Sequence, residues 1–429
     1  MDSRSLPSIV QLSGCLDDFD PGAVPVQTAQ ELIGQWVQPV PAIEKVALRD
    51  CLGRMLGTDV LSNINVPAHD NSAMDGWAIR STDLDASGAA RLAVASGTAW
   101  AGRPWEGSLV SPGEAVRVFT GAVMPPGCDT VVPQEWVQFD PSGAVLLVPP
   151  GQRSGQNRRL AGEDLSVGAI ALAQGTRLGA AHLGLAASLG LAELPLRRRV
   201  RVAFFSTGDE LRSIGDPLGP GEVYDSNRYT LWAMLRRLGV ELVDLGVVRD
   251  DPVALEQALR SAAQGADAVI SSGGVSVGEA DFTREVMARV GEVAFWTIAM
   301  RPGRPMAVGR VGEAVYFGLP GNPVAVMVTF LFFVRDALLR MAGARPEPLL
   351  TVPVRSVHAL RKRAGRTEYQ RAVVSSASDG QLEARVTGQQ GSGVLRSMAE
   401  ANAMLVLRHE QGDIAAGDSV DALLFEGLL

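Results

Sequence analysis

VRVAFFST at residues 200–207 opens an alternation of strands and helices that continues with VELVDLGVV at 240–248 and DAVISSGG at 267–274. Each run is short and apolar, as expected for a strand. The segments between the runs, around residues 229–238 and from Pro252 onward, have helical character. This alternation predicts a parallel α/β sheet. Ligands of such sheets bind beyond the carboxyl ends of the strands, so chemistry is expected in the loops that follow the strands.

The chain on either side of this α/β module divides into further domains. Apolar residues at helical spacing begin near Ala29 and return in an Ala- and Leu-rich stretch at 176–194, which predicts two parts of one helical module. Val-rich runs between Gly and Pro turns separate those parts and indicate an inserted β-rich domain. Short strands return near the end and predict a small β-barrel or sandwich. The expected domains are 24–62 plus 161–196 (helical, discontinuous), 63–160 (inserted, β-rich), 197–345 (α/β) and 346–429 (β-barrel-like).

The composition is typical of a globular cytoplasmic protein. A length of 429 residues suggests several domains, and the net charge of −8 gives no overall attraction to nucleic acid or anionic lipid. The most apolar run, residues 324–334, is far shorter than the roughly 20 residues that span a bilayer. The N-terminus does not resemble a secretory signal. The three cysteines are far apart, so a disulfide framework is not indicated and a reducing compartment fits.

Two loops after predicted strands have features of anion sites. The first holds two hydroxyls and two glycines in succession: Ser271, Ser272, Gly273 and Gly274. Glycine lets backbone N–H groups approach an anion closely. In the second loop, GLPGNP at 318–323, Asn322 is predicted as an N-cap and Pro323 as the first helical residue, so the helix would direct free N–H groups into the same crevice. Neither loop is a recognised nucleotide motif, and a structural turn remains an equally open alternative.

Carboxylates collect in loops of the same kind. They are Glu210, Asp250, Asp251, Glu279 and Asp281, with others in DNSAMDG at 70–76 and GED at 162–164. Carboxylates would repel a bound phosphate, and a divalent cation between them removes the conflict. Mg²⁺ suits a site of oxygen ligands without His or Cys. For any single Asp, a cap of a helix or turn is the more common role.

Arg301 and Arg304 lie in the segment MRPGRP, after an apolar run. Proline and glycine should hold both side chains in a turn, where they could capture an oxyanion. A solvated loop is the alternative, because two arginines in a loop are common. The four histidines are scattered and are interpreted as structural or surface residues.

Long motifs spread over nearly the whole chain occur in the order found in a known family. They are DNSAMDGWA (70–78), TGAVMPPGCDTVV (120–132), RSGQN with AGEDL (153–165), FFSTGDEL (204–211), SSGGVSVGEADF (271–282) and GLPGNPVA (318–325). With these motifs the chain resembles the molybdopterin molybdenumtransferase family, which includes the C-terminal domain of gephyrin. Motifs of this length, in this order, are far more specific than any single loop.

The resemblance implies an elongated homodimer with a multidomain α/β fold: a molybdopterin-binding α/β domain, a discontinuous helical module, an inserted β-rich domain and a C-terminal β-barrel-like domain. The active site would lie between the α/β domain of one subunit and the inserted domain of the other. The catalytic positions implied by the motifs are Asp75, Thr120, Asp164, Glu210, Asp250 and Asp281, of which the last four would hold Mg²⁺. The expected substrate-binding positions are Ser271, Ser272, Gly273, Gly274, Arg301, Arg304, Pro320, Asn322, Pro323, Arg366 and Ser392.

The reaction implied by the resemblance is insertion of molybdate into adenylylated molybdopterin, which releases AMP and yields molybdenum cofactor. Mg²⁺ would polarise the pyrophosphate linkage, while Arg301 and Arg304 would position molybdate. The family's usual pattern, FWK followed by KPGKP, is FWT and RPGRP here, with Thr297 in place of a lysine. Arginine keeps a fixed positive charge but excludes a titratable amine. Other proteins of cofactor biosynthesis are expected as partners.

Two other functions remain as alternatives. A non-catalytic scaffold that presents a peptide-binding groove is permitted by the resemblance to gephyrin, but such a protein would not need the complete set of carboxylates. The related adenylyltransferase step would use the α/β module alone, so the flanking domains argue against it.

Overall fold

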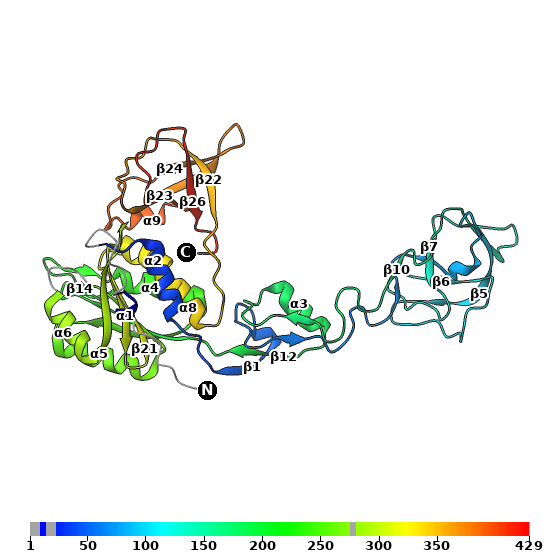
Figure 1. The fold of residues 1–429 in the computed structure, drawn as a ribbon, viewed down its shortest axis with the longest axis horizontal. Coiled ribbons are helices and arrows are strands. Elements are labelled where there is room, and N and C mark those ends of the chain that lie inside the picture. Colours follow the sequence, from blue (N-terminus) through cyan, green and yellow to red (C-terminus); the bar gives the residue numbers. More distant parts are fainter. Residues whose placement is uncertain (1–8, 14–22, 275–279, 429) are drawn as a thin grey trace.

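A computed structural model describes residues 9–13, 23–274 and 280–428. Figure 1 shows an elongated molecule in which a large body lies at one end, a narrow arm leads away from it, and a small β-domain lies at the far end of the arm. The large body combines the α/β sheet with a C-terminal barrel. No helix in the described ranges is long and apolar enough to cross a membrane.

A six-stranded sheet with the strand order β16-β13-β17-β21-β20-β18 forms the centre of the large body. Its strands are β13 (Arg201–Thr207), β16 (Glu241–Val248), β17 (Ala268–Ser272), β18 (Gly291–Thr297), β20 (Pro305–Val311) and β21 (Ala314–Leu319). The first four strands in this order are parallel, whereas β20 and β18 are antiparallel to their neighbours. Only two residues, 312 and 313, join β20 to β21, and a connection of that length requires antiparallel strands. The predicted α/β fold is confirmed, with an antiparallel pair at one edge.

Helices cover both faces of the sheet because alternate side chains of its strands are buried in different cores. Val202 and Phe204 face one core, whereas Ala203 and Phe205 face the other. The first core is completed by α1 (Ile9–Ser13), α2 (Val26–Trp36), α4 (Ser226–Leu238) and the consecutive segments α7 (Pro323–Thr329), η3 (Phe330–Val334) and α8 (Arg335–Met341). The second core is completed by α5 (Pro252–Gly265) and α6 (Ala280–Val290).

The arm is built from two passages of the chain that run in opposite directions. Its elements are β1 (Ile43–Ala47), η1 (Leu48–Asp50), β2 (Val60–Leu61), β11 (Ile170–Leu172), α3 (Ala180–Ser188) and β12 (Glu193–Arg197). β1 pairs with β12, and β2 pairs with β11. A small core with Leu56 and Leu196 at its centre holds the two passages together.

The module expected at 24–62 plus 161–196 differs from this arm at its first helix. Ala29, Ile33 and Trp36 of α2 are buried in the core of the large body, against η3 and α8. Residues 43–61 form strands and a single turn of 3-10 helix instead of a second helix. The apolar face of α2 therefore belongs to the large body, and α3 is the one α-helix that the described residues contribute to the arm.

The domain at the far end of the arm contains a six-stranded sheet of the order β7-β4-β6-β5-β9-β8. Its elements are β3 (Asn71–Ser72), β4 (Gly76–Ile79), η2 (Ser81–Asp83), β5 (Ala90–Ala99), β6 (Glu114–Val118), β7 (Thr130–Pro133), β8 (Gln138–Phe139), β9 (Val145–Val148) and β10 (Arg158–Arg159). Trp77 and Ile79 face one small core, and Ala78 faces another. The β-rich character predicted for this insertion is present.

The C-terminal region is a closed barrel of five strands in the order β23-β24-β22-β26-β25, because β25 pairs back with β23. The elements are β22 (Thr351–Ser356), β23 (Thr367–Ser376), β24 (Leu382–Val386), α9 (Arg396–Ala399), β25 (Ala403–Leu407) and β26 (Ser419–Leu424). A short strand from the α/β domain, β19 (Met300–Arg301), pairs in parallel with the start of β23. This pairing attaches the barrel to the loop between β18 and β20.

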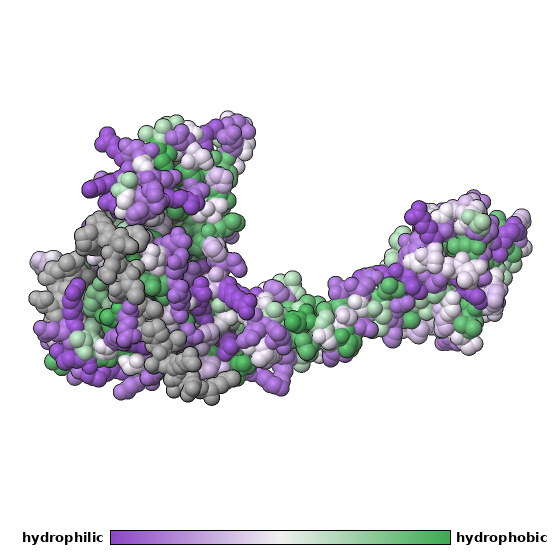
Figure 2. Space-filling view, viewed as in Figure 1, coloured by the Kyte–Doolittle hydropathy of each residue, from purple (hydrophilic) through white to green (hydrophobic). Residues whose placement is uncertain are grey.

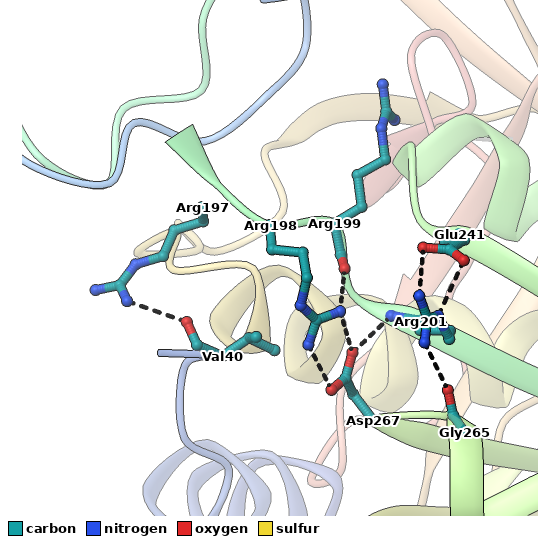
Figure 3. Close-up of polar contacts among 8 residues, drawn as sticks. All are labelled: Val40, Arg197, Arg198, Arg199, Arg201, Glu241, Gly265 and Asp267. Atoms are coloured by element: carbon teal, nitrogen blue, oxygen red, sulfur yellow. Dashed lines mark hydrogen bonds and ion pairs between the residues drawn. The ribbon is translucent and has the colours of Figure 1, made fainter. Parts of the chain in front are cut away.

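Arginines at 197–201 connect the arm to the sheet (Figure 3). Arg198 donates two hydrogen bonds to the Asp267 carboxylate at 2.9 and 3.0 Å, and the Arg201 N–H donates to the same carboxylate at 2.7 Å. The Arg201 side chain pairs with Glu241. Arg197 donates to the Val40 carbonyl at 3.0 Å, which ties the chain entering the arm to the chain leaving it.

We predict that Asp267→Asn lowers the free energy of unfolding by about 1–3 kcal/mol, because it weakens a bidentate charge-assisted contact at this junction. The shift in the midpoint of urea denaturation measures the change. Glu193→Gln removes the partner of Lys45 in an exposed ion pair and should cost less than about 1 kcal/mol. Equal shifts for the two variants would contradict a special role of the junction.

Candidate active site

The loops that follow the parallel strands meet at one edge of the sheet and line a cavity of about 940 Å³. Thr207 ends β13 and is followed by Gly208 and Glu210, and Asp250 follows β16. The lining residues after β17 and β21 are Gly273, Gly274, Pro320, Gly321 and Asn322. Parallel strands end at the same edge, so these separate sequence segments form one wall, as predicted.

A second part of the cavity wall carries guanidinium groups. Arg301 and Arg304 come from the segment Met300–Pro305, and Arg366 comes from the barrel. The barrel also contributes Gln390, Gly391 and Ser392. The pairing of β19 with β23 sets Arg301 opposite Glu368 and so holds these segments together. The cavity therefore lies between the α/β domain and the barrel, with carboxylates from the loops after β13 and β16 and arginines from the β19 segment and the barrel.

Gly273 allows a very close approach of two loops. Its φ is +97°, and a Cβ atom at this position would lie 2.4 Å from the Thr207 carbonyl oxygen and 2.8 Å from the Thr207 Oγ1. The following Gly274 also has a positive φ, of +68°. Any other residue at position 273 would push the loop after β17 away from the loop after β13, so the glycines predicted here are required by the geometry.

Ser271 and Ser272 do not line this cavity, although they were expected to face a phosphate. Both are buried, and the Ser271 hydroxyl lies 2.6 Å from the Tyr316 hydroxyl, whose pKa is raised by burial. The Ser272 hydroxyl accepts a hydrogen bond from Asn227 at 2.9 Å and donates to the Pro320 carbonyl at 3.3 Å. Their hydroxyls support the loops from beneath because they lie inside the strand, where neighbouring strands surround them.

Asp225 and Asn227 form a buried polar layer that the sequence reasoning missed. Asp225 accepts hydrogen bonds from the Ser206 hydroxyl at 3.0 Å and from a backbone N–H at the start of α4. Asn227 donates to Ser272 and to the Gly321 carbonyl, at 2.9 and 2.7 Å. The layer thus links the ends of β13 and β17 to the loop after β21. The available signal was the sequence DSN at 225–227, which precedes a helix but follows no strand of the sheet directly.

The start of α7 differs from the prediction in one respect. Pro323 is its first residue and Asn322 its N-cap, but the Asn322 side chain makes no capping hydrogen bond. The Val324 N–H, one of the donors expected to face an anion, donates instead to the Ser392 carbonyl at 3.0 Å. The barrel therefore caps this helix, because the Ser392 carbonyl already accepts the hydrogen bond that the Val324 N–H would donate to a ligand. Asn322 lines the cavity, whereas Pro323 lies beside the lining residues.

The three arginines of the cavity differ in whether a neighbouring carboxylate is paired with their positive charge. Arg366 is paired with the buried Glu368 carboxylate, with Nε–O and Nη2–O distances of 2.9 and 2.7 Å. Arg301 and Arg304 are exposed, and within the described chain neither has an ion-pair partner. The positive charge of the lining that no described carboxylate pairs with therefore comes mainly from the segment RPGRP.

The carboxylates expected to form a metal site are not all brought together. Glu210 and Asp250 line the cavity, and Thr207 Oγ1 beside them is buried without a hydrogen-bond partner among the described residues. Asp164 is exposed in the arm, next to the bridge between Val66 and Leu165. Asp281 belongs to the first turn of α6, and its side chain lies outside the described part of the structure, as does the whole of Glu279. Within the described ranges, no three His, Cys, Asp or Glu side chains are close enough to hold a metal.

Asp75 and Thr120 form a second polar site, at the far end of the molecule. The backbone N–H and the hydroxyl of Thr120 both donate to one oxygen of Asp75, at 2.8 and 2.7 Å. These two hydrogen bonds, with the charge of Arg117 nearby, lower the pKa of Asp75. The two residues belong to the inserted domain, which lies at the opposite end of the molecule from the cavity (Figure 1). A single chain therefore does not bring this pair to the cavity.

Three family models match consecutive parts of the chain. They are the MoeA N-terminal region (domain I and II) at residues 24–190, a probable molybdopterin binding domain at 203–340 and the MoeA C-terminal region (domain IV) at 354–425.

Relatives of known name resemble the chain along most of its length. A molybdopterin molybdenumtransferase of Haemophilus influenzae is 40% identical over 390 residues, covering 90% of this chain and 95% of the relative. A protein of the same name from Nostoc sp. is 38% identical, covering 86% and 85%. The crystal structure of a molybdopterin biosynthesis moeA protein from Pyrococcus horikoshii has a TM-score of 0.78 at 27% identity and covers 94% of this chain and 100% of its own. By these matches the chain belongs to the molybdopterin molybdenumtransferase family.

Proposed function

We propose that this protein inserts molybdate into adenylylated molybdopterin and releases AMP, yielding molybdenum cofactor. The observation that carries the proposal is the cavity lined by both carboxylates and arginines, at the edge of the sheet where ligands of α/β domains bind. A substrate with phosphates, together with an oxyanion, matches this division of charge. The names of the relatives support the same chemistry.

Each wall of the cavity has a proposed role. Arg301 and Arg304 would hold the molybdate dianion through fixed charge and several N–H donors, with Arg366 and Ser392 beside them. The glycines at 273 and 274 would admit the phosphates close to the backbone of the opposite wall. We propose that the pterin substrate occupies the space between the two walls.

Glu210 and Asp250, from the loops after β13 and β16, are the proposed ligands of Mg²⁺ in the cavity. Asp164 and Asp281 are further candidates. Carboxylate and hydroxyl oxygens without nitrogen or sulfur suit this cation, and the unpaired Thr207 hydroxyl fits such a donor set. Bound Mg²⁺ would supply positive charge for the pyrophosphate oxygens. The residues of the chain orient the two reactants and screen them from water.

A homodimer would bring the second polar site to the cavity. We propose that the partner subunit's Asp75 and the partner subunit's Thr120 complete the active site, since they lie far from the cavity of their own chain. The surface of the arm supports an interface, because Figure 2 shows apolar (green) surface along the arm. The large exposed apolar side chains of these segments are Ile43, Leu52, Leu61, Val167 and Ile170. We also propose that the chain is divided into four domains and is located in the cytoplasm. Other proteins of cofactor biosynthesis are proposed as its partners.

The function is tested by incubating the pure protein with adenylylated molybdopterin, molybdate and Mg²⁺. We expect AMP and molybdenum cofactor to form in equal amounts and both to disappear after chelation of Mg²⁺, because the phosphates and carboxylates would then repel each other. AMP is measured by chromatography and the cofactor by reconstitution of an apo-molybdoenzyme. Full turnover in metal-free buffer would contradict the role of Mg²⁺, and absence of AMP would contradict the function.

We predict that Arg301→Ala raises the molybdate concentration for half-maximal rate by about 10-fold to 150-fold, the value of one lost charge-assisted hydrogen bond. Arg301→Lys keeps the charge and should have a much smaller effect. The rate is measured against molybdate at saturating pterin substrate. If Ala leaves this dependence unchanged, or if Lys is as damaging as Ala, the solvated-loop alternative is correct.

We predict that Asp75→Asn and Asp250→Asn are each inactive but partly restore activity when they are mixed. In a heterodimer one of the two shared sites regains both wild-type residues, and the other site carries both substitutions. The activity of the heterodimer should therefore approach half of that of the wild-type dimer. The subunits are mixed by unfolding and refolding, and heterodimers are isolated with two different affinity tags. Verified heterodimers without activity would contradict a shared site.

A further inference from the structure

The barrel contains a buried arginine, Arg371, that faces away from the solvent and toward the loop lining the cavity. Its side chain is 1% exposed. Its Nε donates to the Ser397 hydroxyl at 3.0 Å, and its two terminal nitrogens donate to three successive carbonyls, those of Gln389, Gln390 and Gly391, at 3.3, 3.2 and 2.9 Å. The guanidinium therefore fixes the backbone of residues 389–391 through the three carbonyl oxygens.

The orientation of these carbonyls determines where the adjoining N–H groups point. In a planar trans peptide the C=O of one residue and the N–H of the next are antiparallel. Because the carbonyls of residues 389–391 point toward Arg371, the N–H groups of Gln390, Gly391 and Ser392 point away from it. These same three residues line the cavity. None of the three N–H groups has a hydrogen-bond acceptor within the described residues.

The charge of Arg371 is not balanced by a carboxylate. Within the described residues its hydrogen-bond partners are neutral oxygens, whereas Arg366, five residues earlier and directly before β23, is paired with Glu368. Burial, and next the charge of Arg301, lower the pKa of Arg371 to about 10, so it remains protonated at neutral pH. A buried and uncompensated cation is costly for folding, which calls for a gain elsewhere.

We propose that Arg371 is a positioning residue for oxyanion binding: it turns the N–H groups of residues 390–392 into the cavity and adds positive charge behind them. The occupant is a tetrahedral oxyanion, which we assign to molybdate, since Arg301 and Arg304 face the same space. The inference rests on the proposed function. It adds a backbone donor set, and the arginine that orients it, to the side chains already assigned there.

The backbone of Arg371 is fixed as firmly as its side chain, which makes the arrangement rigid before any ligand binds. Its N–H donates to Gln390 Oε1 at 2.8 Å, and its carbonyl accepts from Gln390 Nε2 at 3.1 Å. The Thr387 hydroxyl donates to the Ser397 carbonyl at 3.1 Å on the same side of the barrel. Donors that are oriented in advance lose little entropy when an anion binds.

The test compares Arg371→Met and Arg371→Lys with the matched control Arg355→Met. Arg355 lies on the same barrel but is paired with Asp379 and Glu383 and does not line the cavity. We expect Arg371→Met to weaken molybdate binding, measured by calorimetry, by about 10-fold or more. Lys keeps the charge but cannot hold three carbonyls, so it should fall between Met and wild type. In Arg371→Lys the rate at saturating molybdate should change little. The molybdate concentration for half-maximal rate should rise instead.

Amide hydrogen exchange distinguishes a role of Arg371 in anion binding from a purely structural role. Molybdate should protect the peptide that spans residues 389–392 in wild type and in Arg355→Met, but not in Arg371→Met. Wild-type affinity and protection in a folded Arg371→Met would overturn the proposal. If Met does not fold, a folded Arg371→Lys with wild-type affinity and protection overturns it equally.

Two further arms separate this inference from the function and from another oxyanion. Failure of the wild-type protein to bind molybdate or release AMP would contradict the proposed function itself, whereas an active wild type with unaffected Arg371 variants contradicts only the inference. Inorganic phosphate should displace molybdate only at far higher concentration. Displacement at equal concentration would assign the loop to a phosphate of the pterin substrate and overturn the assignment to molybdate.

Discussion

The pairing of Met300 and Arg301 with Thr367 and Glu368 is the interaction on which the cavity depends. It joins a loop of the sheet to β23 of the barrel, and so places the barrel over the carboxyl edge of the parallel strands. The contact of the Val324 N–H with the Ser392 carbonyl adds a second attachment between the same two bodies. Without these backbone contacts the two walls would belong to separate domains and would enclose no common space.

Charge is sorted between the two walls by their origin in the fold. The sheet edge contributes Glu210 and Asp250, whereas the β18–β20 loop and the barrel contribute Arg301, Arg304 and Arg366. The cavity therefore offers groups of both signs to a ligand, and they come from different segments of the fold. The exception is Arg366, whose partner Glu368 follows it closely in the chain and is buried, while Arg366 itself stays partly exposed.

The sequence predicted the fold class and most of the cavity lining, because strand periodicity and post-strand loops are local signals. Glu210, Asp250, Gly273 and Arg301 were located by this reasoning alone. It could not predict that Ser271 lies under the loop, since one residue of register decides whether a side chain faces a cavity or a neighbouring strand. The roles of Asn227 and Arg371 depend on partners that are distant in the chain or on a folded barrel, and such contacts leave no local pattern.

The packing of α2 against the end of the large body has a consequence for the order in which the protein folds during synthesis. The Gln30 side chain donates to the Phe332 carbonyl at 3.0 Å, and these residues are 302 positions apart. At roughly 5–20 residues per second, the ribosome needs on the order of 15–60 s to make the chain between them. For that time the apolar face of α2 lacks the surfaces of η3 and α8 that cover it in the folded protein, which makes this helix a natural target for a chaperone that binds nascent chains.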